Sequence, residues 1–188
     1  MARALTKSDI LTSTGSRINF RAEQTFDSEQ KRHYLNGAVT VFHCHHYVSL
    51  LSQLAGDAVN FEGPRLLAET AAEVFGGALR AYYRAQAVKN IPDRISIAEQ
   101  YFAFVGLGKI EFEFWDGGGM ATLRHSHVDE GWRKKWGQSE HRVNFIGEGY
   151  IQGAWAAIFD RKNPTDCLIT ETQSIVSGAS SSRFEMSW

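Results

Sequence analysis

The chain has 188 residues, of which 43% are hydrophobic and 12% aromatic, enough to form one domain around a core of its own. This composition excludes an intrinsically disordered protein. The formal net charge is -1 at pH 7, and the one dense basic run, 133–135, closely follows two acidic residues. Because phosphate binding requires a clustered basic excess, we expect no nucleic-acid partner.

Apolar residues do not run long enough in this sequence to predict a membrane helix. Polar residues interrupt the two longest apolar-rich stretches, 37–59 and 143–159, before the roughly 20 consecutive positions that a bilayer span needs. The N-terminus lacks the apolar run of a secretory signal. We therefore expect a cytoplasmic protein with no membrane partner. In that compartment the two cysteines, Cys44 and Cys167, are expected to be free thiols.

The N-terminal part of the chain is polar and rich in turn residues. Residues 1–16 end in Ser13-Thr14-Gly15-Ser16, which predicts a flexible N-terminus, followed by a single domain over 17–188. Two short strands are predicted over 17–22 and 30–35, separated by a turn at Asp27-Ser28. They would form a hairpin.

Three helices are predicted next, because apolar residues recur at spacings of three and four. The first covers 38–57, the second begins at Pro64 and extends to Tyr82, and the third covers 92–105. The second contains Gly76-Gly77, which either permits close helix packing or marks a kink.

The remaining elements predict an antiparallel sheet. Residues 110–114 alternate apolar with charged side chains, and glycines at 117–119 turn the chain back into a strand over 120–125. A short helix over 128–136 and a strongly apolar helix over 145–159 follow, and the final strands cover 166–172 and 182–188. Strands and helices are segregated and do not alternate, which indicates an α+β fold.

The apolar helix over 145–159 contains three glycines. Gly147, Gly149 and Gly153 are small enough to let another backbone or a ligand approach closely.

Three imidazoles and a thiol stand side by side in His43-Cys44-His45-His46, and these are ligand types that zinc and iron prefer. In a helix, His43 and His46 would share one face, whereas in a strand His43 and His45 would do so. Either way, about two of the four side chains can reach one ion. Further ligands would have to come from distant positions, for which the candidates are His125, His127, His141, Cys167 and Glu171. The alternative is that these histidines are hydrogen-bonded residues at the edge of the core.

The C-terminal third resembles a known family. The segments that carry the resemblance are Val143-Asn144-Phe145, Gly149-Tyr150-Ile151-Gln152-Gly153-Ala154, Asp166-Cys167-Leu168-Ile169-Thr170-Glu171, Gly178 and Arg183-Phe184-Glu185-Met186. They are similar to the 4-vinyl reductase small-molecule-binding domain. The resemblance implies an α+β fold with an antiparallel sheet and several helices on one face. It also implies an apolar pocket and a tendency to dimerise.

One departure from the family concerns metal. Many members hold zinc with a pair of cysteines near the C-terminus, and the matching positions here are Gln173 and Ser182. The usual thiolate site is therefore not expected. A divalent zinc or iron ion, if bound, would depend more on the cluster at His43 to His46.

We consider three functions. The first is a domain that binds a small hydrophobic or aromatic molecule in an apolar pocket. Its candidate binding residues are His43, His46, Phe102, Trp132, Glu148, Tyr150, Gln152 and Trp155. For each of these aromatics, the alternative is that it belongs to the core.

The second function is a metal-dependent or thiol-dependent enzyme acting on a small cyclic or tetrapyrrole-type substrate. Cys44 would be the nucleophile and His45 the proton shuttle. Gly106-Leu107-Gly108 lacks the rest of a dinucleotide fingerprint and no phosphate loop is present, so no nicotinamide or nucleotide cofactor is expected. The third function is an assembly factor whose C-terminal strand, 183–188, pairs with a second copy. A homodimer is compatible with all three.

Overall fold

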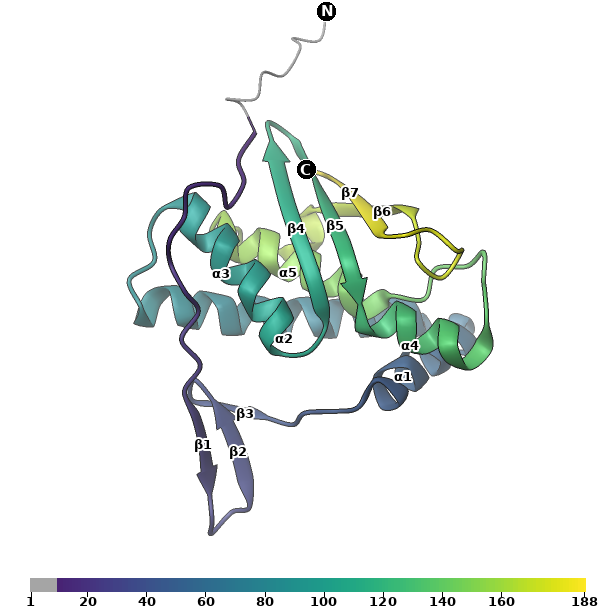
Figure 1. Ribbon diagram of the computed structural model, residues 1–188, viewed down its shortest axis with the longest axis horizontal. Helices are drawn as coiled ribbons and strands as arrows, with labels where there is room; N and C mark the ends of the chain where they lie inside the picture. Colours follow the sequence, from purple (N-terminus) through teal and green to yellow (C-terminus); the bar gives the residue numbers. More distant parts are fainter. Residues whose placement is uncertain (1–9) are drawn as a thin grey trace, which may run out of the picture.

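The computed structural model describes residues 10–188 and has an antiparallel four-stranded sheet with the strand order β4-β5-β7-β6 (Figure 1). Strands β4 and β5 form the predicted hairpin, and β7 lies between β5 and β6. The strands are β4 (Gly108–Trp115), β5 (Gly118–Ser126), β6 (Leu168–Gln173) and β7 (Ser182–Ser187).

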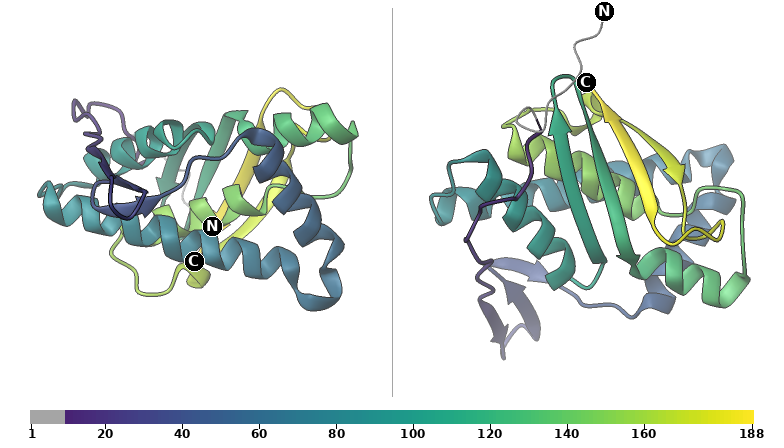
Figure 2. Two further views of the ribbon diagram at one scale, coloured as in Figure 1. Left: turned by 90° about the horizontal axis from the view of Figure 1, so that it is seen from below. Right: turned by 45° about the horizontal axis from the view of Figure 1, so that its top comes forward.

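Side chains on one face of this sheet form the core. Buried and exposed residues alternate along β4 and β7, so that Phe112, Phe114 and Phe184 point inward together. Behind this face lies α5 (Phe145–Ile158), and α2 (Gly63–Ala85) packs on the far side of α5 (Figures 1 and 2). Helix α3 (Ile91–Phe104) leads into β4. The prediction of an α+β fold with helices on one face of an antiparallel sheet is confirmed.

Helix α5 is the centre of the domain and is buried on nearly every side. Twelve of its 14 residues are buried, and the two exceptions are Glu148 and Gln152. Gly149 and Gly153 allow close contact with α2, because a Cβ atom at Gly153 would lie 2.5 Å from the carbonyl oxygen of Ala72. Gly76 of α2 faces Gly153 in the same contact, and α2 is continuous. Close packing is therefore the correct interpretation for Gly76, whereas a Cβ atom at Gly77 would have nothing within 4 Å.

A second, small sheet forms an arm that stands away from the body (Figure 1). It consists of β1 (Gln24–Asp27), β2 (Arg32–Leu35) and β3 (Ala38–Thr40). The predicted strand over 17–22 is wrong. Those residues are irregular, and the backbone amides of Phe20 and Arg21 donate to the side chains of Gln100 and Tyr82.

The predicted start of the first helix at residue 38 is also wrong. Asn36 and Gly37 both have positive φ, at 48° and 81°, and form a tight turn that sends 38–40 back along β2 as a strand. Helix α1 (His45–Asp57) begins seven residues later than predicted, and the short helix η2 (Val59–Phe61) follows it.

The other predicted helices are present with similar bounds. Helix α4 (His127–Trp136) begins where the Ser126 hydroxyl accepts from the backbone amide of Asp129, and the Asn144 side chain caps α5 in the same way. A short helix, η3 (Pro164–Asp166), precedes β6. Among residues 10–188, none of the helices is both long and apolar enough to cross a bilayer.

The structure bears on two expectations about the ends of the chain. Residues 1–9 of the expected flexible segment 1–16 lie outside the described residues, whereas Leu11 forms two backbone hydrogen bonds with Phe114 of β4. The expectation that the C-terminal strand is an open edge is wrong, because β7 is paired on both sides. It cannot add a strand from a second copy.

Candidate functional site

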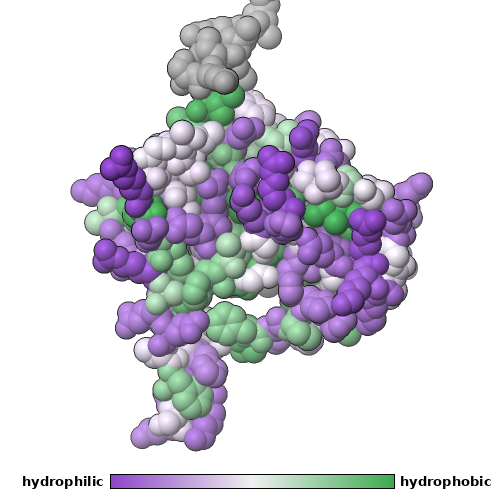
Figure 3. Space-filling view, viewed as in Figure 1, coloured by the Kyte–Doolittle hydropathy of each residue, from purple (hydrophilic) through white to green (hydrophobic). Residues whose placement is uncertain are grey.

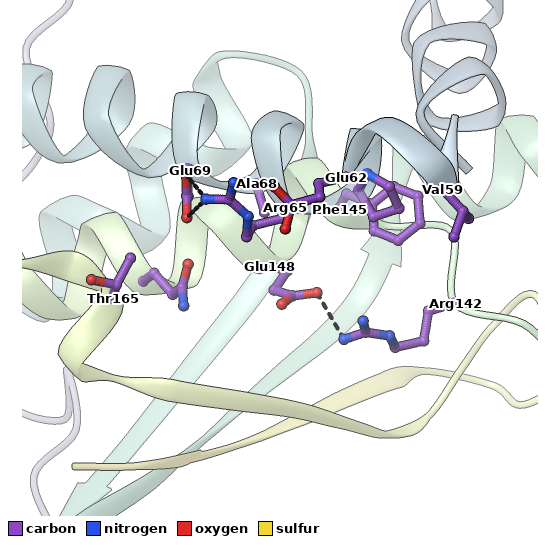
Figure 4. Close-up of a pocket in the computed structure, with 11 residues that line it drawn as sticks. Val59, Glu62, Arg65, Ala68, Glu69, Arg142, Phe145, Glu148 and Thr165 are labelled. Carbon is purple, nitrogen blue, oxygen red and sulfur yellow. Dashed lines mark hydrogen bonds and ion pairs between the residues drawn. The ribbon is translucent and has the colours of Figure 1, made fainter. Parts of the chain in front are cut away.

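A pocket of about 440 Å³ opens between α2 and α5 (Figure 4), and we call it the α2–α5 pocket. Its volume lies within the range of small-molecule sites. Its walls come from η2, the first turns of α2, the segment before α5 and α5 itself. The lining residues are Val59, Glu62, Pro64, Arg65, Ala68, Glu69, Arg142, Phe145, Glu148, Gln152 and Thr165.

The polar end of this pocket comes from α5. Glu148 and Gln152, the two residues of that helix that are not buried, are four positions apart and therefore share one face. The Glu148 carboxylate accepts from the Arg142 guanidinium at 3.1 Å. Burial raises the pKa of Glu148, and Arg142 partly opposes this shift. The Gln152 side chain donates to the carbonyl of Cys167 at 3.0 Å.

The rest of the pocket combines apolar walls with a neutralised rim. Val59, Pro64, Ala68 and Phe145 supply the apolar surface. On the rim, Arg65 is held between Glu62 and Glu69, with nitrogen to oxygen distances of 2.6 and 2.7 Å (Figure 4). Because each rim carboxylate already has a partner, the rim does not select strongly for ligand charge.

A second hollow of about 170 Å³ adjoins Arg142 and contains Glu171 of β6. Burial raises the pKa of Glu171 to about 7, and its Oε1 atom has no hydrogen-bond partner among the described residues. Nearby, the fully buried Asp129 accepts from Ser182 and Asn144 through Oδ2, while no partner is present for Oδ1 within 10–188. Burial raises the pKa of Asp129 as well.

Gln173 and Ser182, which the sequence resemblance aligns with zinc ligands, do not fit that ion. The Ser182 hydroxyl accepts from the Ile175 amide and donates to Asp129, and the Gln173 side-chain amide donates to Ser181. These polar atoms are committed to protein partners, and neither side chain supplies a thiolate or imidazole. The Ser182 hydroxyl is instead part of the hydrogen-bond network of Asp129.

The histidine and cysteine cluster lies at the start of α1, and most of it is exposed. His43 precedes the helix and stacks on Tyr47, Cys44 is the exposed N-cap residue, and His46 is exposed. His43 and His46 therefore do not share a helical face. His45 is half-buried against α4, where its ring lies 5.3 Å from that of His127 and its Nε2 atom has no hydrogen-bond partner among the described residues.

The other candidate ligands lie apart from one another. His125 is exposed beside Glu130, and His127 is the first residue of α4. His141 is exposed, whereas Cys167 is buried and its carbonyl accepts from Gln152 of α5. Over residues 10–188, no group of three or more His, Cys, Asp or Glu side chains is placed to hold a metal ion. Metal at the cluster stays a prediction, which elemental analysis of the purified protein tests.

Among the predicted binding residues, the structure brings Glu148 and Gln152 to one pocket. Phe102, Tyr150 and Trp155 are buried in the core and do not line it, as the alternative interpretation of these aromatics states. Trp132 of α4 packs with Val143 and Val176 in a separate small cluster, and its indole donates to Gln53. The sequence analysis did not predict that Arg142 and Phe145 line this pocket. Both lie within two residues of Asn144, the N-cap of α5, and recognising that cap could have placed them near Glu148.

Comparisons define the fold class to which this architecture belongs. No family model and no curated protein matches the chain. Among solved structures, the chain shares the fold of a small-molecule-sensing domain, the phenol-responsive sensory domain of the transcription activator PoxR with phenol. The TM-score is 0.70 at 13% identity, and the match covers 87% of this chain and 84% of that one.

A second solved structure is more distant. It is a trafficking protein particle complex subunit 3 from Naegleria fowleri covalently bound to palmitic acid, with a TM-score of 0.46 and 9% identity. The match covers 75% of this chain and 94% of that one.

Proposed function

We propose that this chain is a ligand-binding domain of the 4-vinyl reductase type, which takes a small hydrophobic or aromatic molecule in the α2–α5 pocket. One observation carries the proposal. Helix α5 is buried all round except at Glu148 and Gln152, and both residues open onto the same pocket. Burying a polar side chain costs stability unless it is hydrogen-bonded, and Arg142 and the Cys167 carbonyl supply these bonds, so the polar pair can be kept at the pocket.

The pocket chemistry indicates the class of ligand. Phe145, Ala68 and Val59 provide an apolar wall, and Glu148 provides a hydrogen-bond acceptor beside it. This pattern suits an aromatic or alicyclic molecule that carries one hydroxyl or amine, with the donor directed at Glu148. The shared fold with a phenol-responsive sensory domain supports phenol as the first probe.

Phenol and toluene form a matched pair for testing the proposal. We expect phenol to raise the melting temperature of the purified protein and toluene to do so less, because toluene lacks the donor that Glu148 accepts. Glu148→Gln should weaken phenol binding by at least about tenfold in calorimetric titration. The matched control is Glu113→Gln on the exposed face of β4, which should leave binding unchanged.

Two outcomes of these measurements would contradict the proposal. If neither compound alters melting and native mass spectrometry of fresh protein finds no small apolar passenger, the ligand-binding proposal is wrong. If phenol binds equally to wild type and to Glu148→Gln, the α2–α5 pocket is not its site.

A further inference from the structure

A separate pocket of about 340 Å³ lies at the end of α2 that is far from the α2–α5 pocket, and we call it the basic pocket. It opens where α2 ends, α3 begins and the chain leaves α5. In Figure 3, hydrophilic side chains gather at the end of the body where α2 leads into α3. None of its lining residues belongs to the α2–α5 pocket, so the proposed function leaves this pocket without a role.

Positive charge is concentrated in the basic pocket. Four cations line it, Arg80, Arg84, Lys89 and Arg94, against one carboxylate, that of Asp160. The chain as a whole is almost balanced, with 20 Lys and Arg against 21 Asp and Glu. Arg94 already holds Asp160 at 2.6 Å, and no ion pair involves the other three cations anywhere in 10–188. The pocket therefore has an uncompensated positive field.

The two helices that end at this pocket do not need all of these cations. Carbonyl groups at the C-terminus of a helix favour nearby positive charge. At the end of α2 the Val88 amide donates to the Tyr83 carbonyl, and an equivalent backbone bond closes α5. Arg94 donates to the carbonyl of Ile158, the last residue of α5, at 2.9 Å. Arg94 therefore serves the fold, and the other three cations have no such task.

Arg80 has a hydrogen-bonding capacity that the fold does not use. Its Nη1 atom is closed to solvent and has no acceptor within the described part of the chain. A buried charged donor without a partner costs stability, so an acceptor that reaches the pocket gains by pairing with it. Arg80 and Arg84 are four positions apart on α2 and share one face, so both guanidinium groups can reach one anion.

We propose that the basic pocket binds a phosphate group, either as the free ion or as the phosphate monoester of a small molecule. The planar guanidinium fork matches two oxygen atoms of a phosphate, and a dianion suits three unpaired cations better than a carboxylate does. The volume of the pocket lies within the range of small-molecule sites. Along α2, Arg84 lies roughly 28 Å from Arg65 of the α2–α5 pocket, so the two sites are separate.

Titration with sodium phosphate tests the proposal. At constant ionic strength, the backbone amide signals of residues 84–94 should shift in a saturable manner in the NMR spectrum of the wild type. Arg84→Gln, at an exposed position, should weaken phosphate binding by at least about tenfold. Arg80→Lys, which keeps the charge but loses the fork, should do the same. The matched control is Arg183→Gln on the exposed face of β7, which removes an equal charge and should leave phosphate binding unchanged.

Glycerol 3-phosphate as a second probe distinguishes the two sources of the phosphate group. Tighter binding than inorganic phosphate supports a monoester as the ligand, and equal affinity supports the free ion. Three outcomes overturn the proposal: no saturable shift with either probe, the same shifts with sodium chloride alone, or unchanged phosphate affinity in both Arg84→Gln and Arg80→Lys. The wild-type spectrum decides the first two even if a variant fails to fold. Phenol binding in the α2–α5 pocket is measured separately, so the two proposals fail independently.

Discussion

Glu171 shows how folding can trap a carboxyl group in an unfavourable place. It lies on the edge strand β6, its Oε1 atom has no hydrogen-bond partner among the described residues, and Asp129 and Glu148 are near enough to disfavour its charge. Burial is the main cause that raises its pKa, from 4.5 to about 7. The Ser174 side chain and Arg142 oppose the rise in pKa, and Arg142 is itself bonded to Glu148.

This raised pKa predicts a loss of stability as the pH increases. Below 4.5 the carboxyl is protonated in both the folded and the unfolded state, and above about 7 it is charged in both. Between these values the folded protein holds a proton that the unfolded chain has released, so its stability falls with rising pH. Glu171→Gln should remove this slope and stabilise the protein at about pH 8 by roughly 2 kcal/mol, after allowance for partial exposure.

Urea denaturation at about pH 5 and about pH 8 measures the difference. Glu185→Gln, which removes an exposed carboxyl from the adjacent strand β7, is the control and should leave the slope intact. Equal pH slopes for wild type and Glu171→Gln would contradict the assignment.

At the scale of elements, the contact of α2 with α5 depends on glycines. Gly149 and Gly153 bring the α5 backbone against carbonyl groups of α2, and these contacts leave no space for a methyl group. Ala68, whose backbone Gly149 contacts, also lines the α2–α5 pocket together with Glu148. The close approach therefore also fixes the width of the pocket.

Two glycine substitutions separate packing from helix propensity. Gly153→Ala should destabilise the protein by at least about 2 kcal/mol, because its methyl group would meet the Ala72 carbonyl and the Gly76 amide. Gly77→Ala has nothing within 4 Å of its new methyl group and should stabilise α2 by about 0.5 to 1 kcal/mol. Thermal unfolding of both variants checks the pair, and a stable Gly153→Ala would show that α2 and α5 can separate without loss.

Most of the helices and strands could be predicted from the sequence, but α1 and β3 could not be placed correctly. Apolar spacing predicted α2, α3, α4, α5 and the β4-β5 hairpin, because the apolar residues of each element pack into the core of this domain. Helix α1 was predicted from the same spacing, but its buried residues are Ser49 and Ser52, whereas Leu50 and Leu54 are exposed. The Asn36-Gly37 turn was a local signal for β3 that the helical spacing concealed.

For the candidate site, the sequence supplied the polar residues but not the walls. Glu148 and Gln152 stand out as polar positions in an apolar helix, so they could be predicted. Val59 and Ala68 are ordinary apolar residues whose role depends on the crossing of α2 over α5, which no local pattern encodes. The aromatic residues carried no signal to distinguish core from pocket.

At the scale of the whole molecule, η2 connects the α2–α5 pocket with α1. Val59 of η2 lines the pocket and is itself exposed, and η2 joins α1 directly to α2. A ligand that packs against Val59 would therefore also order the connection between these two helices.

Val59→Ala, which shortens the side chain that η2 contributes to the pocket, should weaken phenol binding by about fivefold, because the ligand loses apolar contact with this wall. Calorimetric titration of phenol into both proteins measures the factor, and Val74→Ala, at a similarly exposed valine of α2 that does not line the pocket, is the control. Equal phenol affinity of wild type and Val59→Ala would mean that η2 takes no part in the site.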